Sequence, residues 1–224
     1  MRSPAARIGF HASLTACSAS VAFSIVQTLQ LTPGLPKPLD EILIYGSSLL
    51  IATPYLLAMV ALHATVPDHK KVWTHAAIVF GVLYCAYVSL NYVVQLATVV
   101  PARLQGTISE IALLDQTPHS LFWDVDALGY IFLGFSTLTA ALALDTRERW
   151  LRRFLVANAA ITPVIGFVYF YPRFSIPLLL LGIPWLITVP GSLVLLTRHF
   201  QRLARADEGI TSTSVARGAA PSRA

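Results

Sequence analysis

Long uncharged stretches alternate with short polar segments along the whole chain. Each stretch has at least 18 residues without Asp, Glu, Lys or Arg, and about 20 apolar residues rising 1.5 Å each cross a bilayer core of about 30 Å. A helix on a soluble core would show a charged outer face, which these stretches lack. The pattern predicts an all-α polytopic membrane protein, a bundle of six transmembrane helices within residues 1–205. The predicted spans are residues 8–31, 42–66, 72–100, 127–144, 154–171 and 174–197.

The basic residues between the spans predict the orientation. Of the 16 lysines and arginines, 13 fall in the N-terminus, every second gap and the C-terminal tail, whereas only Lys37, Arg103 and Arg173 lie in the other gaps. Cytoplasmic segments of membrane proteins carry the excess of Lys and Arg, so both termini are predicted inside, N-in and C-in, in the bacterial inner membrane. The net charge of +5 is therefore a topology signal, and it does not indicate binding of nucleic acid.

The N-terminal run, the two cysteines and the C-terminal tail each allow a separate prediction. Arg2 and Arg7 before an apolar run also resemble the start of a signal peptide, but the run is longer and more polar than such peptides need, so a first span is favoured over cleavage. Cys17 and Cys85 both fall within spans and are expected to serve as small packing residues. The small, polar residues 206–224 are typical of a disordered cytoplasmic tail.

Polar residues recur at helical spacing along the third span. Because steps of three and four residues return to the same side of a helix, they share one face, and that face must look toward protein or water, since lipid offers no hydrogen-bonding partner. With the chain running outward here, the stripe approaches the outer side. Its members are Tyr84, Tyr87, Asn91, Gln95 and Thr98.

The entrance of the fourth span adds acidic and phenolic groups on the same outer side. Asp126 and Tyr130 lie one turn apart, whereas Asp124 points elsewhere. Tyr169 and Tyr171, at the outer end of the fifth span, are placed to join them. Two interpretations stay open, namely hydrogen bonds that only hold helices together and a polar binding pocket. The candidate ligand-binding residues are Tyr87, Asn91, Gln95, His119, Asp126 and Tyr130.

The outer loop over residues 101–123 is the longest connection. Apolar positions such as Ile108 and Ile111 interleave with Glu110 and Asp115, which favours a short interfacial amphipathic helix. Such a helix either acts as a lid over the polar cluster or only shields the end of the bundle.

Prolines within the spans predict irregular helices. Pro54 and Pro163 fall in mid-span, and Pro184 and Pro190 interrupt the sixth span, so kinks or broken turns are expected there. These breaks mark either a hinge or an ordinary bend.

Recognised catalytic and metal-binding motifs are missing from the sequence. It has no Gly-x-Ser-x-Gly elbow, no His-Glu-x-x-His, no phosphate-binding glycine loop and no Cys-x-x-Cys. His119 with Asp126 or Glu110 is the only acid-base pair that suggests an enzyme. Most histidines lie near the inner side without ligand spacing, so no metal, haem or other cofactor is predicted.

One part of the chain resembles known sequences. The residues Asn91-Tyr92, Val99-Val100-Pro101, Pro118-His119, Phe122-Trp123 and Leu128-Gly129-Tyr130 resemble a group of uncharacterised bacterial six-span membrane proteins. The resemblance covers roughly residues 91–205, and it implies the six-helix membrane architecture without any substrate, cofactor or reaction.

The sequence thus leads to a functional hypothesis with two alternatives. We expect a membrane protein that binds or transports a small molecule through a polar pocket in its outer half, with the lipid bilayer and that molecule as its partners. The alternatives are a membrane-embedded enzyme acting on a lipid or quinone-like substrate, and a structural or assembly protein that uses its arginine-rich inner loop and tail. The oligomeric state is not indicated.

Overall fold

Helices make up all the regular structure of the part of the chain that is described. The computed structural model describes residues 4–30 and 34–218, with side chains as far as Ala206. Six of its helices are long and apolar enough to cross a membrane. The all-α fold with six spans is confirmed, and the chain is an integral membrane protein. The long helices are α1 (Pro4–Gln30), α2 (Leu39–Thr65), α3 (Lys71–Val94), α5 (Leu121–Ala143), α6 (Arg149–Phe170) and α8 (Trp185–Gly218).

Short elements modify the predicted spans at several points. Two 3-10 turns, Asp68–Lys70 and Thr146–Glu148, lead into α3 and α6. A π-helix, Gln95–Val99, continues α3 into the short α4 (Val100–Gln105). The sixth predicted span is divided, because α7 (Ile176–Leu180) stops before Pro184 and α8 begins after it.

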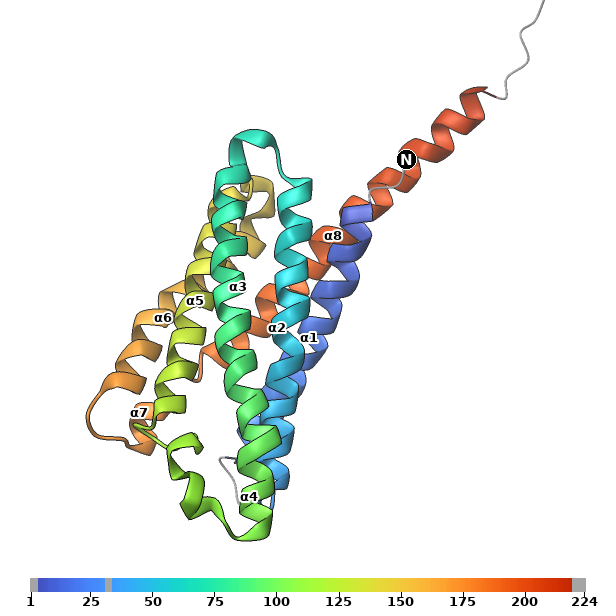
Figure 1. Ribbon diagram of the computed structural model, residues 1–224. Helices are drawn as coiled ribbons and strands as arrows, with labels where there is room; N and C mark the ends of the chain where they lie inside the picture. Colours follow the sequence, from blue (N-terminus) through green and yellow to red (C-terminus); the bar gives the residue numbers. More distant parts are fainter. Residues whose placement is uncertain (1–3, 31–33, 219–224) are drawn as a thin grey trace, which may run out of the picture.

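The six long helices form a closed ring. α1 packs against α2, α2 against α3, α3 against α5 and α5 against α6, and α8 closes the ring through α6 and α1. Figure 1 shows α2, α3, α5 and α6 running side by side, with α1 and α8 leaning together toward the upper right. Chain neighbours are therefore mostly neighbours in space, as short connections dictate.

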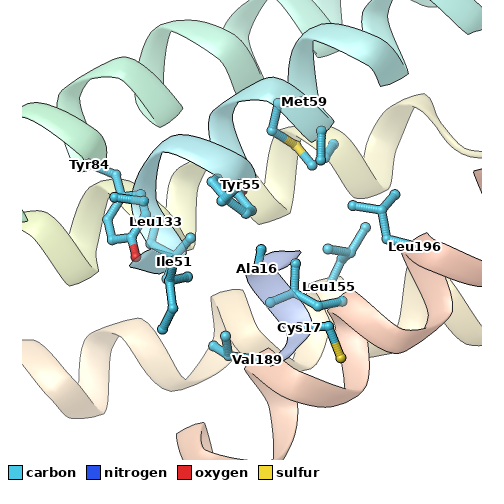
Figure 2. Packing of buried hydrophobic residues seen from close by; sticks show 14 of the residues in the cluster. Ala16, Cys17, Ile51, Tyr55, Met59, Tyr84, Leu133, Leu155, Val189 and Leu196 are labelled. Carbon is cyan, nitrogen blue, oxygen red and sulfur yellow. The ribbon is translucent and has the colours of Figure 1, made fainter. Parts of the chain in front are cut away.

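The core lies at the centre of this ring. Figure 2 shows labelled core residues from all six long helices, among them Ala16, Met59, Tyr84, Leu133 and Leu196. Large apolar side chains such as Leu50 and Ile187 are instead exposed on the outside of the ring. This distribution suits a bundle whose surroundings are lipid, because lipid chains are as apolar as the side chains that face them.

Ion pairs join the loops at the predicted inner end. Lys70, before α3, pairs with Asp145, after α5, and this ammonium lowers the pKa of the Asp145 carboxyl below its usual range. Glu148 contacts both His199 (3.2 Å) and Arg202 (2.6 Å) on α8. Some of the basic residues that predict topology therefore also join the helix ends, while the orientation itself stays a prediction.

Helix α8 extends well beyond the predicted sixth span. It projects from the bundle in Figure 1 and continues to Gly218. It thus runs into residues 206–224, for which the composition indicates a disordered tail, and residues 219–224 of that tail lie outside the described residues. The prediction of a disordered tail is therefore left as a prediction.

The long outer loop contains a short helical segment, and its predicted position at the membrane interface stays a prediction. Residues Ile108–Leu114 form a 3-10 helix that is bent at Ile111. Gly106 precedes it with φ 76°, a left-handed conformation that glycine adopts without strain. This turn reverses the chain after α4 and carries the loop back over the end of the bundle (Figure 1).

Candidate functional site

A buried carboxylate lies at the centre of the polar residues. Asp126 is 3% exposed, and its two oxygens accept four hydrogen bonds. Oδ1 accepts from the Tyr92 hydroxyl (2.8 Å) and the Asn91 amide (3.2 Å). Oδ2 accepts from the Tyr169 hydroxyl (2.8 Å) and the Gln116 amide (3.0 Å). Two donors on each oxygen match the capacity of a carboxylate, so its acceptor sites are filled by neutral groups.

The donors are themselves linked into one network. The Gln116 oxygen accepts from the Asn91 amide at 3.0 Å. The Gln95 amide donates to the Leu114 carbonyl (2.8 Å), and its oxygen accepts from the Gln116 backbone N–H (3.2 Å). The Tyr92 and Tyr130 hydroxyls lie 3.1 Å apart. We call Asn91, Tyr92, Gln95, Gln116, Asp126, Tyr130 and Tyr169 the Asp126 cluster.

Local contacts position the helices around Asp126. Ser120 caps the start of α5 by accepting from the Trp123 N–H at 3.2 Å, which places Asp126 in the second turn of that helix. Gly129 lets α3 approach, since a Cβ there would lie 2.6 Å from Val88. Trp123 donates its indole N–H to the Tyr169 carbonyl (3.1 Å), and this bond holds the end of α6 beside α5.

Aromatic rings surround the carboxylate. Tyr45 stacks at 5.7 Å from Tyr92, and Trp123 lies 4.4 Å from Tyr169. Tyr130 contacts Trp185 of α8 edge to face at 5.1 Å. A carboxylate among electron-rich rings provides an environment that suits an organic ammonium or hydroxyl group.

The structure brings together four of the six residues that the sequence singled out. Asn91, Gln95, Asp126 and Tyr130 all belong to the Asp126 cluster. Tyr87 lies outside it and packs half-buried against Phe132, with ring centroids 5.5 Å apart.

His119 is likewise separate from the cluster. It is exposed on the outer loop, with φ 67°. The acid-base pair of His119 with Asp126 is therefore not formed in this arrangement.

The π-helix explains why the predicted stripe ends early. Tyr84, Asn91 and Gln95 are buried as their spacing predicts, but Thr98 is exposed and Val99 is buried in its stead. The wider π turn adds a residue to the repeat, so the inward face moves forward by one position between Gln95 and Val99.

Two members of the Asp126 cluster were not anticipated. Tyr92 follows Asn91 directly, and a signal for it existed, because it lies one turn after the buried Val88. Gln116 had no such signal, because its place depends on the path of an irregular loop.

Charged groups fasten the outer loop to the first turn of α2. The Arg103 guanidinium lies 3.1 Å from Glu41 and donates to both oxygens of Asp115 at 3.0 Å. Lys37 adds a second ion pair to Glu41 at 2.9 Å. Arg103 thereby connects α4, α2 and the segment that carries Gln116.

Arg103→Gln is expected to loosen the loop. Losing a partly buried, charge-assisted contact costs roughly 1 to 2 kcal/mol, so backbone amides of residues 107–116 should exchange with deuterium about tenfold faster. Arg173→Gln is the matched control, since Arg173 is an exposed residue on the same predicted side and takes part in no ion pair among the described residues. Equal exchange in both variants would contradict a fastening role for Arg103.

A cavity adjoins the Asp126 cluster on the side of α6, α7 and α8. Its volume is about 100 Å³, and it is partly open. Tyr130 and Tyr169 form part of its wall, together with Trp185. The remaining lining is mostly apolar and includes Phe23, Ile165 and Leu186. The two tyrosines therefore connect the carboxylate to an apolar space.

Metal binding finds no support in the residues that the structure describes. They contain no group of three or more His, Cys, Asp or Glu side chains placed to hold an ion. The chemistry that the Asp126 cluster offers is instead hydrogen bonding and charge attraction by a carboxylate held in place by its neighbours.

Comparisons with known proteins add no relative to these observations. Neither a protein-family model, a curated protein nor a solved structure matches the chain. The class of protein shown is that of a multi-pass, all-α integral membrane protein, and a more specific assignment depends on the Asp126 cluster itself.

Proposed function

We propose that this membrane protein binds a small molecule, for recognition or transport, at the Asp126 cluster in the predicted outer half of the bundle. The observation that carries the proposal is a buried carboxylate balanced by four neutral donors. No ion pair among the described residues includes Asp126. Holding helices together requires no charge, because Asn, Gln and Ser make such bonds without the cost of burying a carboxylate.

One of the four donors differs from the others in its position. Asn91, Tyr92 and Tyr169 belong to long helices, whereas Gln116 comes from the outer loop. Its carboxamide donates to Asp126 and accepts from Asn91, so it illustrates the kind of group, an N–H or O–H donor, that the Asp126 cluster accepts. The ligand class that fits is a small amine or alcohol, which donates to a carboxylate and tolerates aromatic neighbours.

A thermal unfolding assay with n-hexylamine tests the proposal. In lipid nanodiscs, n-hexylamine is expected to raise the Tm of the wild type relative to Asp126→Asn. The asparagine variant keeps the shape of the site but not its charge. Asp124→Asn is the matched control, because Asp124 is an exposed carboxylate two residues earlier on α5. It should respond as the wild type does.

Comparing variants in the same lipid removes the general effect of the amine on the bilayer. A shift of about 5 °C is expected near saturation. If the amine shifts the Tm of Asp126→Asn as much as that of the wild type, the Asp126 cluster only joins helices and the proposed binding is wrong.

A further inference from the structure

The water-facing side of the Asp126 cluster is closed by the outer loop. Gln116 contacts the carboxylate directly, and Gln95 binds the backbone of the loop on either side of Asp115. Arg103 then holds Asp115 to α2 through Glu41. Entry from water therefore requires several hydrogen bonds and two ion pairs to break together.

The side that faces lipid is covered far more loosely. Helix α7 contains no buried residue. Leu180, Leu181 and Ile183 are each about 40 to 50% exposed, and the chain turns at Gly182 and Pro184 before α8 begins. An exposed apolar segment at this depth contacts hydrocarbon. Moving this segment replaces its contacts with the protein by contacts with lipid chains, which costs little free energy because both are apolar.

The cavity under α7 combines mostly apolar walls with three polar side chains, Gln27, Tyr130 and Tyr169. Leu179, Leu180 and Ile183 cover it, and Tyr130 and Tyr169 face it from α5 and α6. A dry apolar cavity of about 150 Å³ accepts a molecule the size of benzene, so about 100 Å³ holds only the first few carbons of a chain. The rest of such a chain would leave through the partly open side.

The direction of the hydrogen bonds selects the head group. Tyr169 donates its proton to Asp126 Oδ2, and Tyr92 donates to Oδ1. Because the Tyr92 proton is used in this way, the Tyr130 hydroxyl donates to the Tyr92 oxygen. The oxygens of Tyr130 and Tyr169 remain as acceptors, and donation toward a carboxylate strengthens them in that role.

We infer that the ligand is a single-chain amphiphile with a hydrogen-bond-donating head group, a long-chain alcohol or amine, that enters from the bilayer beneath α7. This inference rests on the proposed binding at the Asp126 cluster, and it adds the route of entry and the long apolar chain of the ligand. The head group donates to the oxygens of Tyr130 and Tyr169, and the chain runs past Leu180 and Ile183 into the lipid. A quinone, whose carbonyls only accept, is disfavoured at these oxygens.

Two probes of equal chain length test the inference. 1-Dodecanol donates a hydrogen bond, whereas 1-methoxydodecane only accepts one. In nanodiscs, 1-dodecanol is expected to raise the Tm of the wild type by about 5 °C more than 1-methoxydodecane does. Ile183→Trp places a ring in the cavity and should abolish this difference. Ile187→Trp, at an exposed position of α8 outside the lining, should retain it.

Leu180→Trp is a second cavity-filling variant in case Ile183→Trp does not fold, and it should behave as Ile183→Trp does. Equal shifts with the two probes would overturn the head-group assignment, and an undiminished difference in the filled variants would overturn the route. In either case, the proposed function still holds if the Tm shift caused by n-hexylamine depends on Asp126. If n-hexylamine shifts the Tm of Asp126→Asn as much as that of the wild type, both the proposed function and this inference are wrong.

Discussion

Asp126→Leu should destabilise the protein by about 2 to 4 kcal/mol. The substitution removes four accepted hydrogen bonds at once, and bonds between membrane helices are worth about 0.6 to 1 kcal/mol each. The four donors would stay buried around an apolar side chain, because they come from α3, α6 and the outer loop and cannot all turn away. Unfolding in a mixed-micelle titration with a denaturing detergent measures the loss.

The control for this prediction is Asp124→Leu. Asp124 is exposed on the same helix, and its side chain makes no hydrogen bond or ion pair among the described residues, so the change should be within about 0.5 kcal/mol. The loss of stability in Asp126→Asn should lie between those of Asp126→Leu and Asp124→Leu, since phenolic hydroxyls can rotate and the Gln116 amide can flip to suit a carboxamide. An Asp126→Leu protein as stable as the wild type would show that desolvating the carboxylate costs as much as its four bonds return.

The architecture was predictable because lipid leaves few choices. Hydrocarbon excludes unpaired backbone groups, so long uncharged runs must be helices. Each of the six runs lies mainly in helix in the structure, with the sixth divided before Pro184 and residue 31 of the first outside the described residues. The boundaries were less accurate. The run over 127–144 begins inside α5, because Asp124 and Asp126 are carried on the first turns of a helix that Ser120 starts.

The Asp126 cluster was predictable as far as helical spacing reaches. Asn91 and Gln95 share a face because they are four residues apart, and Asp126 and Tyr130 do so for the same reason. Thr98 departs from the stripe because the π-helix shifts the helical repeat by one residue. No local pattern of residues predicts this π turn.

The rest of the site depends on contacts distant in sequence. Gln116 reaches Asp126 from a loop that Gln95 holds by its backbone and that Arg103 joins, through Asp115, to Glu41, a residue 62 positions away from Arg103 along the chain. His119, four residues after Asp115, instead lies exposed with positive φ. Spacing along one helix carries no information about which residue of a loop turns inward, so Gln116 was missed and His119 was favoured.

The contact between α5 and α6 gives the second large expected effect, at Gly134. A Cβ added there would lie 1.8 Å from Thr162 Oγ1, 2.8 Å from its Cβ and 3.0 Å from its Cγ2. Rotating Thr162 cannot relieve these contacts, because its own Cβ is already too close. Gly134→Ala should therefore separate the two helices and destabilise the bundle by about 2 to 3 kcal/mol.

Two comparisons isolate this steric cause. Gly166→Ala, on α6, meets only Ile131 Cδ1 at 4.0 Å, and it should be neutral or slightly stabilising, since alanine favours helix. Gly134→Ala combined with Thr162→Ala should recover part of the loss, because only the contact with the Cβ of residue 162 remains.

Separating α5 from α6 should also affect ligand binding. Tyr169 on α6 and Asp126 on α5 meet only if the two helices are in register, and their bond of 2.8 Å leaves little room for a shift. Gly134→Ala should therefore weaken the response to n-hexylamine along with stability, and the added Thr162→Ala change should restore part of both. Recovery of stability without recovery of the response would show that binding does not depend on the contact between Tyr169 and Asp126.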